Sequence, residues 1–139
     1  MKRLSICWII GCLLGLVACR PEVPAQAEQG ETDVFPDYRE VTVPVNIAPP
    51  NFKLVDQQLQ GITRLKTMNR ELIIAADQGV FNLPETDWKV LSQDAQGKQI
   101  DVTVYFREPQ SNWKQMSFPI YVSRDSVDAY LVYRRIFPG

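Results

Sequence analysis

The chain has 139 residues, with 15 basic and 16 acidic side chains and a net charge of −1 at neutral pH. It contains no histidine, which excludes Ser-His-Asp and Cys-His catalysis and removes the commonest zinc ligand. The weakly acidic balance is unsuited to the phosphate contacts that dominate nucleic-acid binding. We therefore expect a protein that binds no nucleic acid and no metal, and that carries no cofactor.

The N-terminal segment has the order of a bacterial secretory leader. Lys2-Arg3 precedes an apolar run over residues 4–18, and Cys19 follows directly. A basic start, an apolar run and small residues before the cut are typical of a signal peptide, and Leu16-Val17-Ala18 before a cysteine resembles the lipobox. We therefore predict a lipoprotein signal peptide over residues 1–18 and lipidation of Cys19. Acyl chains on Cys19 would make the membrane a partner and place the protein in the cell envelope, facing the periplasm.

Two other interpretations of this leader remain open. A retained membrane-spanning helix needs about 20 apolar residues, whereas this run has about 15 and is interrupted by Gly11 and Gly15. The other interpretation is cleavage of the leader by an ordinary signal peptidase, without lipidation of Cys19. Because Cys7 and Cys12 leave with the leader and Cys19 carries the lipid, the mature chain is expected to form no disulfide.

Residues 19–37 have the composition of a spacer. Prolines and acidic residues are frequent there, and few side chains are apolar. This composition indicates a disordered tether rich in proline and acid. A single folded domain is predicted to follow over residues 38–139, which is an ordinary size for one domain.

The first half of the predicted domain has the pattern of short strands. Apolar residues occupy every second position from Val41 to Ile47, as in a strand with one buried face. Pro44 places this strand at a sheet edge, because proline cannot donate a ladder hydrogen bond. Further strands are predicted over residues 52–55, 62–66, 71–75 and 80–81, the last one after a turn at residues 77–79.

The second half combines one helix with a hairpin. Pro84 with acidic residues behind it predicts a helix start, and Gly97 can end that segment. Residues 100–106 alternate strictly, residues 108–112 supply a loop, and residues 113–122 return as a second strand. Short strands with turn signals and one short helix predict a mostly β fold, a small antiparallel β-sandwich of immunoglobulin or fibronectin type. Residues 127–134 fit either a helix or a strand, and we expect an extended end.

Two stretches carry a resemblance to a known family. Residues 38–52, Tyr-Arg-Glu-Val-Thr-Val-Pro-Val-Asn-Ile-Ala-Pro-Pro-Asn-Phe, and residues 128–139, Asp-Ala-Tyr-Leu-Val-Tyr-Arg-Arg-Ile-Phe-Pro-Gly, resemble signatures of bacterial TolB-like lipoproteins. The resemblance implies an N-terminal sandwich that precedes a β-propeller of PD40-type repeats. This sequence shows no repeat of about 40 residues, so the propeller is missing from it. Either the sequence is a truncated part of a propeller protein, or the small domain acts alone.

Catalytic candidates are few. The closest acidic pairs are Glu85 with Asp87 and Asp125 with Asp128, and paired carboxylates can serve acid–base catalysis or bind Ca²⁺. A helix N-terminus explains the first pair more simply, and a turn explains the second. We therefore predict that the protein is not an enzyme.

The candidate binding residues are aromatic or basic: Tyr105, Tyr121, Tyr130, Tyr133, Arg134 and Arg135. Tyr105 and Tyr121 alternate with the apolar residues of their strands. They should therefore lie on the opposite, exposed face of the sheet. Trp88 and Trp113 are explained more simply by packing in the core or at an edge. The predicted function is a lipid-anchored, non-enzymatic interaction or scaffold module of the envelope, with an envelope protein as partner. The alternative is a lipoprotein that binds a sugar or a peptide with an exposed tyrosine face.

Overall fold

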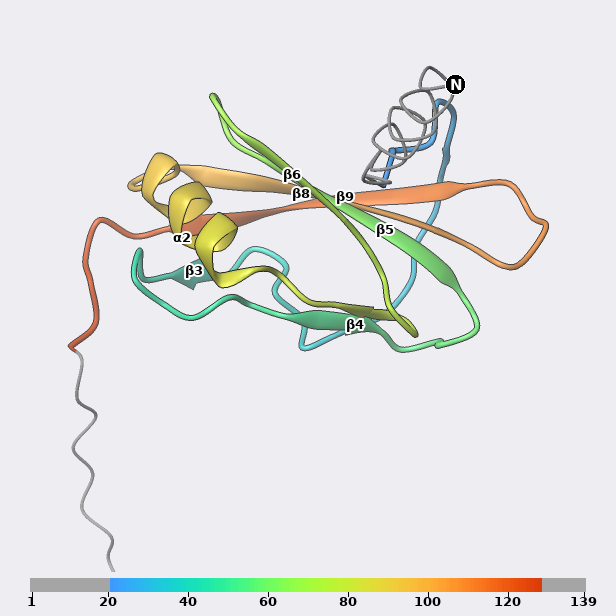
Figure 1. The fold of residues 1–139 in the computed structure, drawn as a ribbon, viewed down its shortest axis with the longest axis horizontal. Coiled ribbons are helices and arrows are strands. Elements are labelled where there is room, and N and C mark those ends of the chain that lie inside the picture. Colours follow the sequence, from blue (N-terminus) through green and yellow to red (C-terminus); the bar gives the residue numbers. More distant parts are fainter. Residues whose placement is uncertain (1–20, 129–139) are drawn as a thin grey trace, which may run out of the picture.

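The computed structural model describes residues 21–128, which form two β-sheets and one helix (Figure 1). The strands are β1 (Glu28–Gln29), β2 (Val34–Phe35), β3 (Thr42–Val43), β4 (Phe52–Leu54), β5 (Gln60–Lys66), β6 (Glu71–Ala75), β7 (Val80–Phe81), β8 (Gln99–Arg107) and β9 (Lys114–Val122). The helix, α2, spans Glu85–Asp94. The larger sheet has the order β1-β9-β8-β5-β6, with β3 also paired to β9, and the smaller sheet has the order β2-β4-β7.

The β8–β9 hairpin forms the centre of the larger sheet. Its two strands pair antiparallel from Gln99 opposite Tyr121 to Phe106 opposite Lys114. Ile100, Val102 and Val104 are fully buried on one face of β8, as strand alternation predicts. On its other side β8 pairs antiparallel with β5, which turns into β6. The predicted hairpin and the strand predicted at residues 71–75 are therefore confirmed.

The outer edge of β9 carries two short parallel strands. β1 pairs with the first residues of β9 and β3 with the last ones. The edge position predicted from Pro44 is confirmed, but the strand covers only Thr42–Val43 and not the predicted residues 41–47. Pro44 can donate no hydrogen bond to β9, and the chain turns at residues 45–46. The sheet is thus mixed at this edge and antiparallel elsewhere.

The structure also differs from the predicted tether over residues 19–37. Residues 28–29 and 34–35 are strands β1 and β2, and the side chain of Val34 is 5% exposed within the core. The folded domain therefore begins before residue 38, at Glu28 or earlier. Composition predicted a spacer because it averages over the segment, whereas one apolar residue such as Val34, at the correct place in a pairing register, is enough to attach the chain to the fold.

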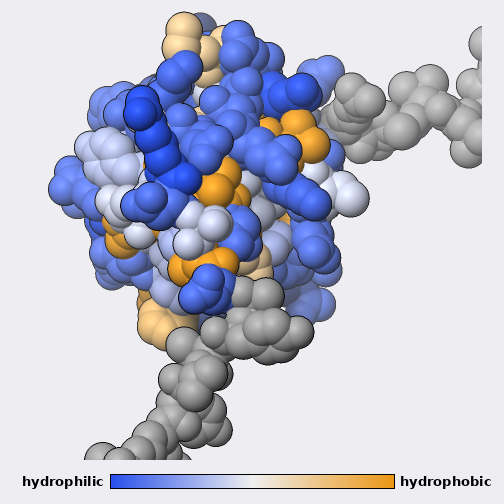
Figure 2. Space-filling model, turned by 90° about the vertical axis from the view of Figure 1, so that its left-hand side faces the viewer, coloured by the Kyte–Doolittle hydropathy of each residue, from blue (hydrophilic) through white to orange (hydrophobic). Residues whose placement is uncertain are grey.

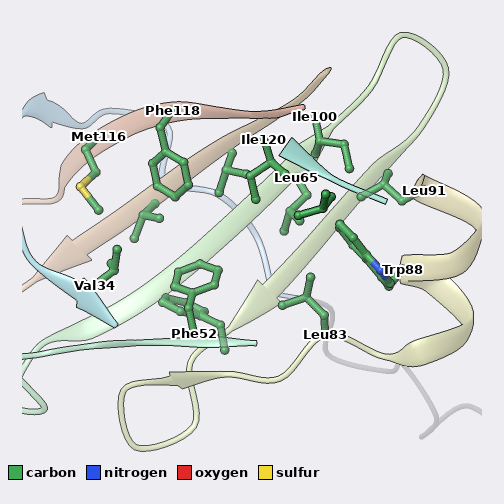
Figure 3. Packing of buried hydrophobic residues seen from close by; sticks show 14 of the residues in the cluster. Val34, Phe52, Leu65, Leu83, Trp88, Leu91, Ile100, Met116, Phe118 and Ile120 are labelled. Carbon is green, nitrogen blue, oxygen red and sulfur yellow. The ribbon is translucent and has the colours of Figure 1, made fainter. Parts of the chain in front are cut away.

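The core lies between the two sheets, with α2 closing one end (Figure 3). Leu65, Ile100, Phe118 and Ile120 of the larger sheet face Phe52 of the smaller one. The rings of Phe52 and Phe81, from adjacent strands, have centroids 4.8 Å apart. The fold is therefore a small, mostly β sandwich with one helix, as the sequence predicted.

The helix follows the predicted local rules. Pro84 stands at its N-cap, and Glu85 and Asp87 lie in the first turn, near the positive end of the helix dipole. The helix buries Trp88 and Leu91, three residues apart on one face. Trp88 is 1% exposed and donates its indole N–H to the carbonyl of Ile47 at 3.0 Å. This bond satisfies the polar atom that the buried indole carries into the core.

Gly61 of β5 lies where the two sheets approach each other closely. A Cβ at this position would be 2.8 Å from Cζ of Phe81 and 2.9 Å from Cδ1 of Leu54, both core atoms of the smaller sheet. These distances are shorter than packed carbon atoms allow. The sheet separation at β5 therefore depends on a residue without a side chain.

We predict that Gly61→Ala lowers the free energy of unfolding by about 1–3 kcal/mol, because the added methyl group overpacks the core. Chemical denaturation monitored by circular dichroism measures this difference. Gln58→Ala, in the exposed loop before β5, is the control and should change stability by less than about 0.5 kcal/mol. Equal stability of Gly61→Ala and the wild type would contradict the packing.

Candidate functional site

The predicted tyrosine face is not formed. Tyr121 is exposed, at 41%, as expected, but Tyr105 is only 4% exposed. Tyr105 does lie on the outer face of β8, opposite Ile62 of β5 and Gln115 of β9. Its burial has a local cause, because both neighbouring strands flank it and the guanidinium of Arg64 lies 5.9 Å from its ring centroid. The expected exposure of Tyr105 is therefore wrong.

The two tyrosines are also far apart. Tyr121 lies opposite Gln99, which is six residues from Tyr105 along β8, or about 20 Å at the rise of a strand. The remaining candidates, Cys19, Tyr130, Tyr133, Arg134 and Arg135, lie outside the described residues 21–128. Lipidation and partner contact at those residues stay predictions.

A cleft lies at the loop end of the β8–β9 hairpin. It has a volume of about 510 Å³ and is bordered by β1, by the loop before β5 and by the hairpin loop. A second cleft of about 300 Å³ adjoins it. The two share Glu28, Arg107, Ser111 and Asn112. The two clefts therefore adjoin, and we call them together the hairpin cleft.

Arg107 and Trp113 form the rigid part of the hairpin cleft. The guanidinium carbon of Arg107 lies 4.4 Å from the centroid of the Trp113 ring, within the range of a cation–π interaction. Arg107 also donates its Nε–H to Oε1 of Gln60 at 2.9 Å. The backbone of Trp113 is held as well, since its carbonyl accepts the N–H of Glu28 at 2.9 Å. Trp113 was predicted to pack in the core or at an edge, and it is half-buried, directly before β9.

The lining of the hairpin cleft is polar and of mixed charge. Its acidic residues are Glu28, Glu31, Asp56 and Glu108, and its basic residues are Arg107 and Lys114. Among residues 21–128, the ion pairs are Arg39 with Asp37 and Arg64 with Glu71. No charged group of the cleft therefore forms an ion pair within this part of the chain.

A second surface feature is apolar and lies on the outer face of the smaller sheet. Phe35 of β2 is 62% exposed and Val55, directly after β4, is 55% exposed. Phe35 lies opposite Lys53, two residues before Val55, so that the two apolar side chains are diagonal neighbours about 7–8 Å apart. Lys53 has its Nζ atom 6.0 Å from the Phe35 ring. We call Phe35, Lys53 and Val55 the outer apolar face.

A third feature is the end of the molecule at which α2 lies. A cleft of about 350 Å³ is bordered by α2 and by residues 45–49. Figure 2 views the molecule from this side and shows hydrophobic residues in several separate places among hydrophilic ones. Scattered single apolar residues of this kind are normal on a protein surface.

Polar side chains fasten the C-terminal end of α2 to the turn between β5 and β6. Oδ2 of Asp94 accepts a hydrogen bond from the hydroxyl of Thr67, and Oδ1 accepts one from the side-chain amide of Asn69 at 3.0 Å. These bonds, the Thr67 bond first, lower the pKa of Asp94 from its ordinary value of 3.8. They also stabilise an acidic residue in the last helical turn, where the dipole disfavours it.

We predict that Asp94→Asn destabilises the protein at neutral pH and that the difference disappears in acid. Because the folded-state pKa is lowered, the carboxylate contributes stability above its unfolded value of 3.8, and that stability is lost as the pH falls through the folded value. Melting temperatures of both proteins from about pH 7 to about pH 2 test this. Asp128→Asn is the control, and a difference that persists unchanged in acid would contradict the prediction.

The acidic pairs lie where their structural explanation places them. Glu85 and Asp87 occupy the first turn of α2. Asp125 lies in the turn after β9, where its backbone N–H is bonded to the hydroxyl of Ser123 at 3.0 Å. Within residues 21–128, no three potential metal ligands among histidine, cysteine, aspartate and glutamate come together. No helix of this part of the chain is long and apolar enough to span a bilayer.

Comparison of the chain with models of protein families, with characterised proteins and with solved structures finds no match. The resemblance to TolB-like lipoproteins therefore stays a prediction from residues 38–52 and 128–139.

The sequence contains one signal for each of the two surface sites. Phe35 is an aromatic residue within a polar segment, and Trp113 follows a loop next to the strand that ends in Arg107. Neither signal identifies its neighbours. Glu28, Asp56 and Asn112 of the hairpin cleft come from separate parts of the chain, and only the pairing of β1 with β9 and of β5 with β8 brings them together.

Proposed function

We propose that this protein is a lipid-anchored, non-enzymatic interaction module of the bacterial cell envelope, and that its outer apolar face binds an envelope protein. The observation that carries the proposal is the exposure of Phe35 and Val55 on one face of a sheet. Burying apolar area contributes about 25 cal/mol per Å². An exposed phenylalanine on a strand therefore offers a partner a preformed anchor of the kind that dominates protein interfaces.

The position of this face relative to the predicted anchor supports the proposal. Fifteen residues separate Cys19 from Val34, a span of at most about 50 Å when extended. Acyl chains on Cys19 would thus keep the face near the membrane, where a weak contact with another membrane-held protein is enough, because tethering raises the effective concentration. An envelope protein as partner also agrees with what the TolB-like resemblance implies.

We predict that the protein extracted from the membranes of its source cell has the mass of a chain that begins at Cys19 and carries acyl groups. Cys19→Ser should be recovered without acyl groups. Intact-mass spectrometry distinguishes these species. A wild-type protein that retains Met1, or that lacks acyl groups, would contradict the lipid anchor but would leave the outer apolar face untouched.

We predict that a photo-crosslinking amino acid placed at Phe35 captures one envelope protein in cells, and that the additional change Val55→Lys abolishes the adduct. The same amino acid at Gln58, in the exposed loop before β5, is the matched control. Phe35→Ala and Val55→Lys should each alter the free energy of unfolding by less than about 0.5 kcal/mol, because both side chains are exposed. Adducts that are the same at positions 35 and 58 would contradict a specific interface.

The alternative function, binding of a sugar or a peptide, loses the two-tyrosine face on which it was predicted, because Tyr105 is buried. The hairpin cleft is the observation that keeps this class open. It places an indole next to carboxylate, amide and hydroxyl side chains in one depression.

A further inference from the structure

The two parts of the hairpin cleft meet at one group of side chains. Glu28, Arg107, Ser111 and Asn112 border both parts. The part that Trp113 borders has a volume of about 300 Å³, at the lower end of the range of about 300–1,000 Å³ usual for small-molecule sites. Neither Phe35 nor Val55 borders the cleft. The cleft therefore shares no bordering residue with Phe35 and Val55 of the outer apolar face.

Trp113 supplies the apolar part of the site. Its indole borders the smaller part of the cleft and contacts the Arg107 guanidinium. The backbone bond from Glu28 to Trp113 and the side-chain bond from Arg107 to Gln60 hold both groups in place. Because these groups are already ordered, a ligand that contacts the indole does not have to immobilise them, which lowers the entropy cost of binding.

The polar part of the site contains both acceptors and donors. The Glu28 carboxylate only accepts hydrogen bonds, whereas the amides of Gln26 and Asn112 and the hydroxyl of Ser111 do both. Arg107 uses Nε–H for Gln60, and its other N–H groups are further donors. The cleft therefore suits a ligand that carries several hydroxyl groups, each of which donates and accepts at once.

The lining excludes other classes of ligand. A purely apolar ligand would leave these polar groups without partners, which is costly. A phosphate or sulfate would meet the carboxylates of Glu28, Glu31, Asp56 and Glu108, which outnumber the basic groups of the cleft, and like charges repel. A neutral molecule with an apolar surface to place on an indole and hydroxyl groups around its rim avoids both costs.

We propose that the hairpin cleft binds a neutral oligosaccharide, with a sugar ring against the indole of Trp113 and its hydroxyl groups hydrogen-bonded to Glu28, Asn112 and Arg107. A sugar ring has both required surfaces, since its C–H groups form an apolar face and its hydroxyl groups lie around the edge. The open position of the cleft at a hairpin loop fits part of a chain of sugars better than an enclosed small molecule.

The test uses the mature protein labelled with ¹⁵N and titrated with neutral trisaccharides of glucose and of N-acetylglucosamine. The indole N–H signal of Trp113 should shift, with half-saturation at roughly millimolar concentration or below. The indole N–H of Trp88 is the internal control, because it is buried and bonded to Ile47, and its signal should stay in place.

Variants distinguish binding at Trp113 from nonspecific binding of the sugar elsewhere on the protein. Trp113→Ala should weaken binding about ten-fold or more, a loss of 1.4 kcal/mol, as followed by the backbone signals of Ser111 and Asn112. Trp113→Phe, which keeps an aromatic ring, should retain part of the affinity and covers the case in which the alanine variant does not fold. Tyr121→Ala removes an exposed aromatic residue at the other end of β9 and should bind as the wild type does.

Three results would overturn the proposal. They are the absence of any Trp113 shift with every neutral trisaccharide at about 10 mM, unchanged affinity in Trp113→Ala, and a shift of Trp113 produced only by a lysine-rich peptide. The last result would identify the carboxylates as the binding groups and a basic peptide as the ligand. None of these results depends on lipidation of Cys19 or on capture at Phe35, so the proposed function is tested separately.

Discussion

The pairing of β8 with β9 is the constraint on which the rest of this fold depends. These are the two longest strands among residues 21–128, each of nine residues, and every other strand of the larger sheet is added to this pair. β5 and then β6 extend the sheet from β8, while β1 and β3 occupy the free edge of β9. The inward side chains of the pair form one wall of the core, against which the smaller sheet and α2 pack.

The two ends of this hairpin have different characters. At the loop end, the pairing of β1 with β9 and of β5 with β8 collects polar groups from distant parts of the chain into the hairpin cleft. At the other end, α2 and residues 45–47 seal the core through bonds from Trp88 to Ile47 and from Ser92 to Val45. Buried polar atoms are satisfied at the sealed end, and unpaired charges remain at the end with the cleft. A core that is closed at the α2 end and polar groups that are exposed at the loop end suit a small binding module.

Local patterns were most reliable where one physical requirement acts alone. The hairpin strands and β6 follow alternation, because one face of each strand must be buried. The start of α2 follows from Pro84 at its N-cap and from the acids behind it, which interact favourably with the helix dipole. The turn at residues 77–79 follows from Gly79, which has a φ of +79° that few other residues adopt. Alternation also identified the outward face for Tyr105, but it could not reveal that Ile62, Gln115 and Arg64 would cover the ring there.

The amino-acid sequence by itself determined the mostly β class, the hairpin and the start of the helix, since each of these depends on residues close together in the chain. The lipid anchor at Cys19 stays a prediction from the sequence. Tertiary structure alone decided that β1 and β2 belong to the folded domain, that Gly61 must lack a side chain, and that Trp113, Glu28 and Asn112 border one cleft. The reason is physical: strand pairing joins segments that can be tens of residues apart, and a side chain is buried, exposed or available for a ligand according to neighbours that no local pattern specifies.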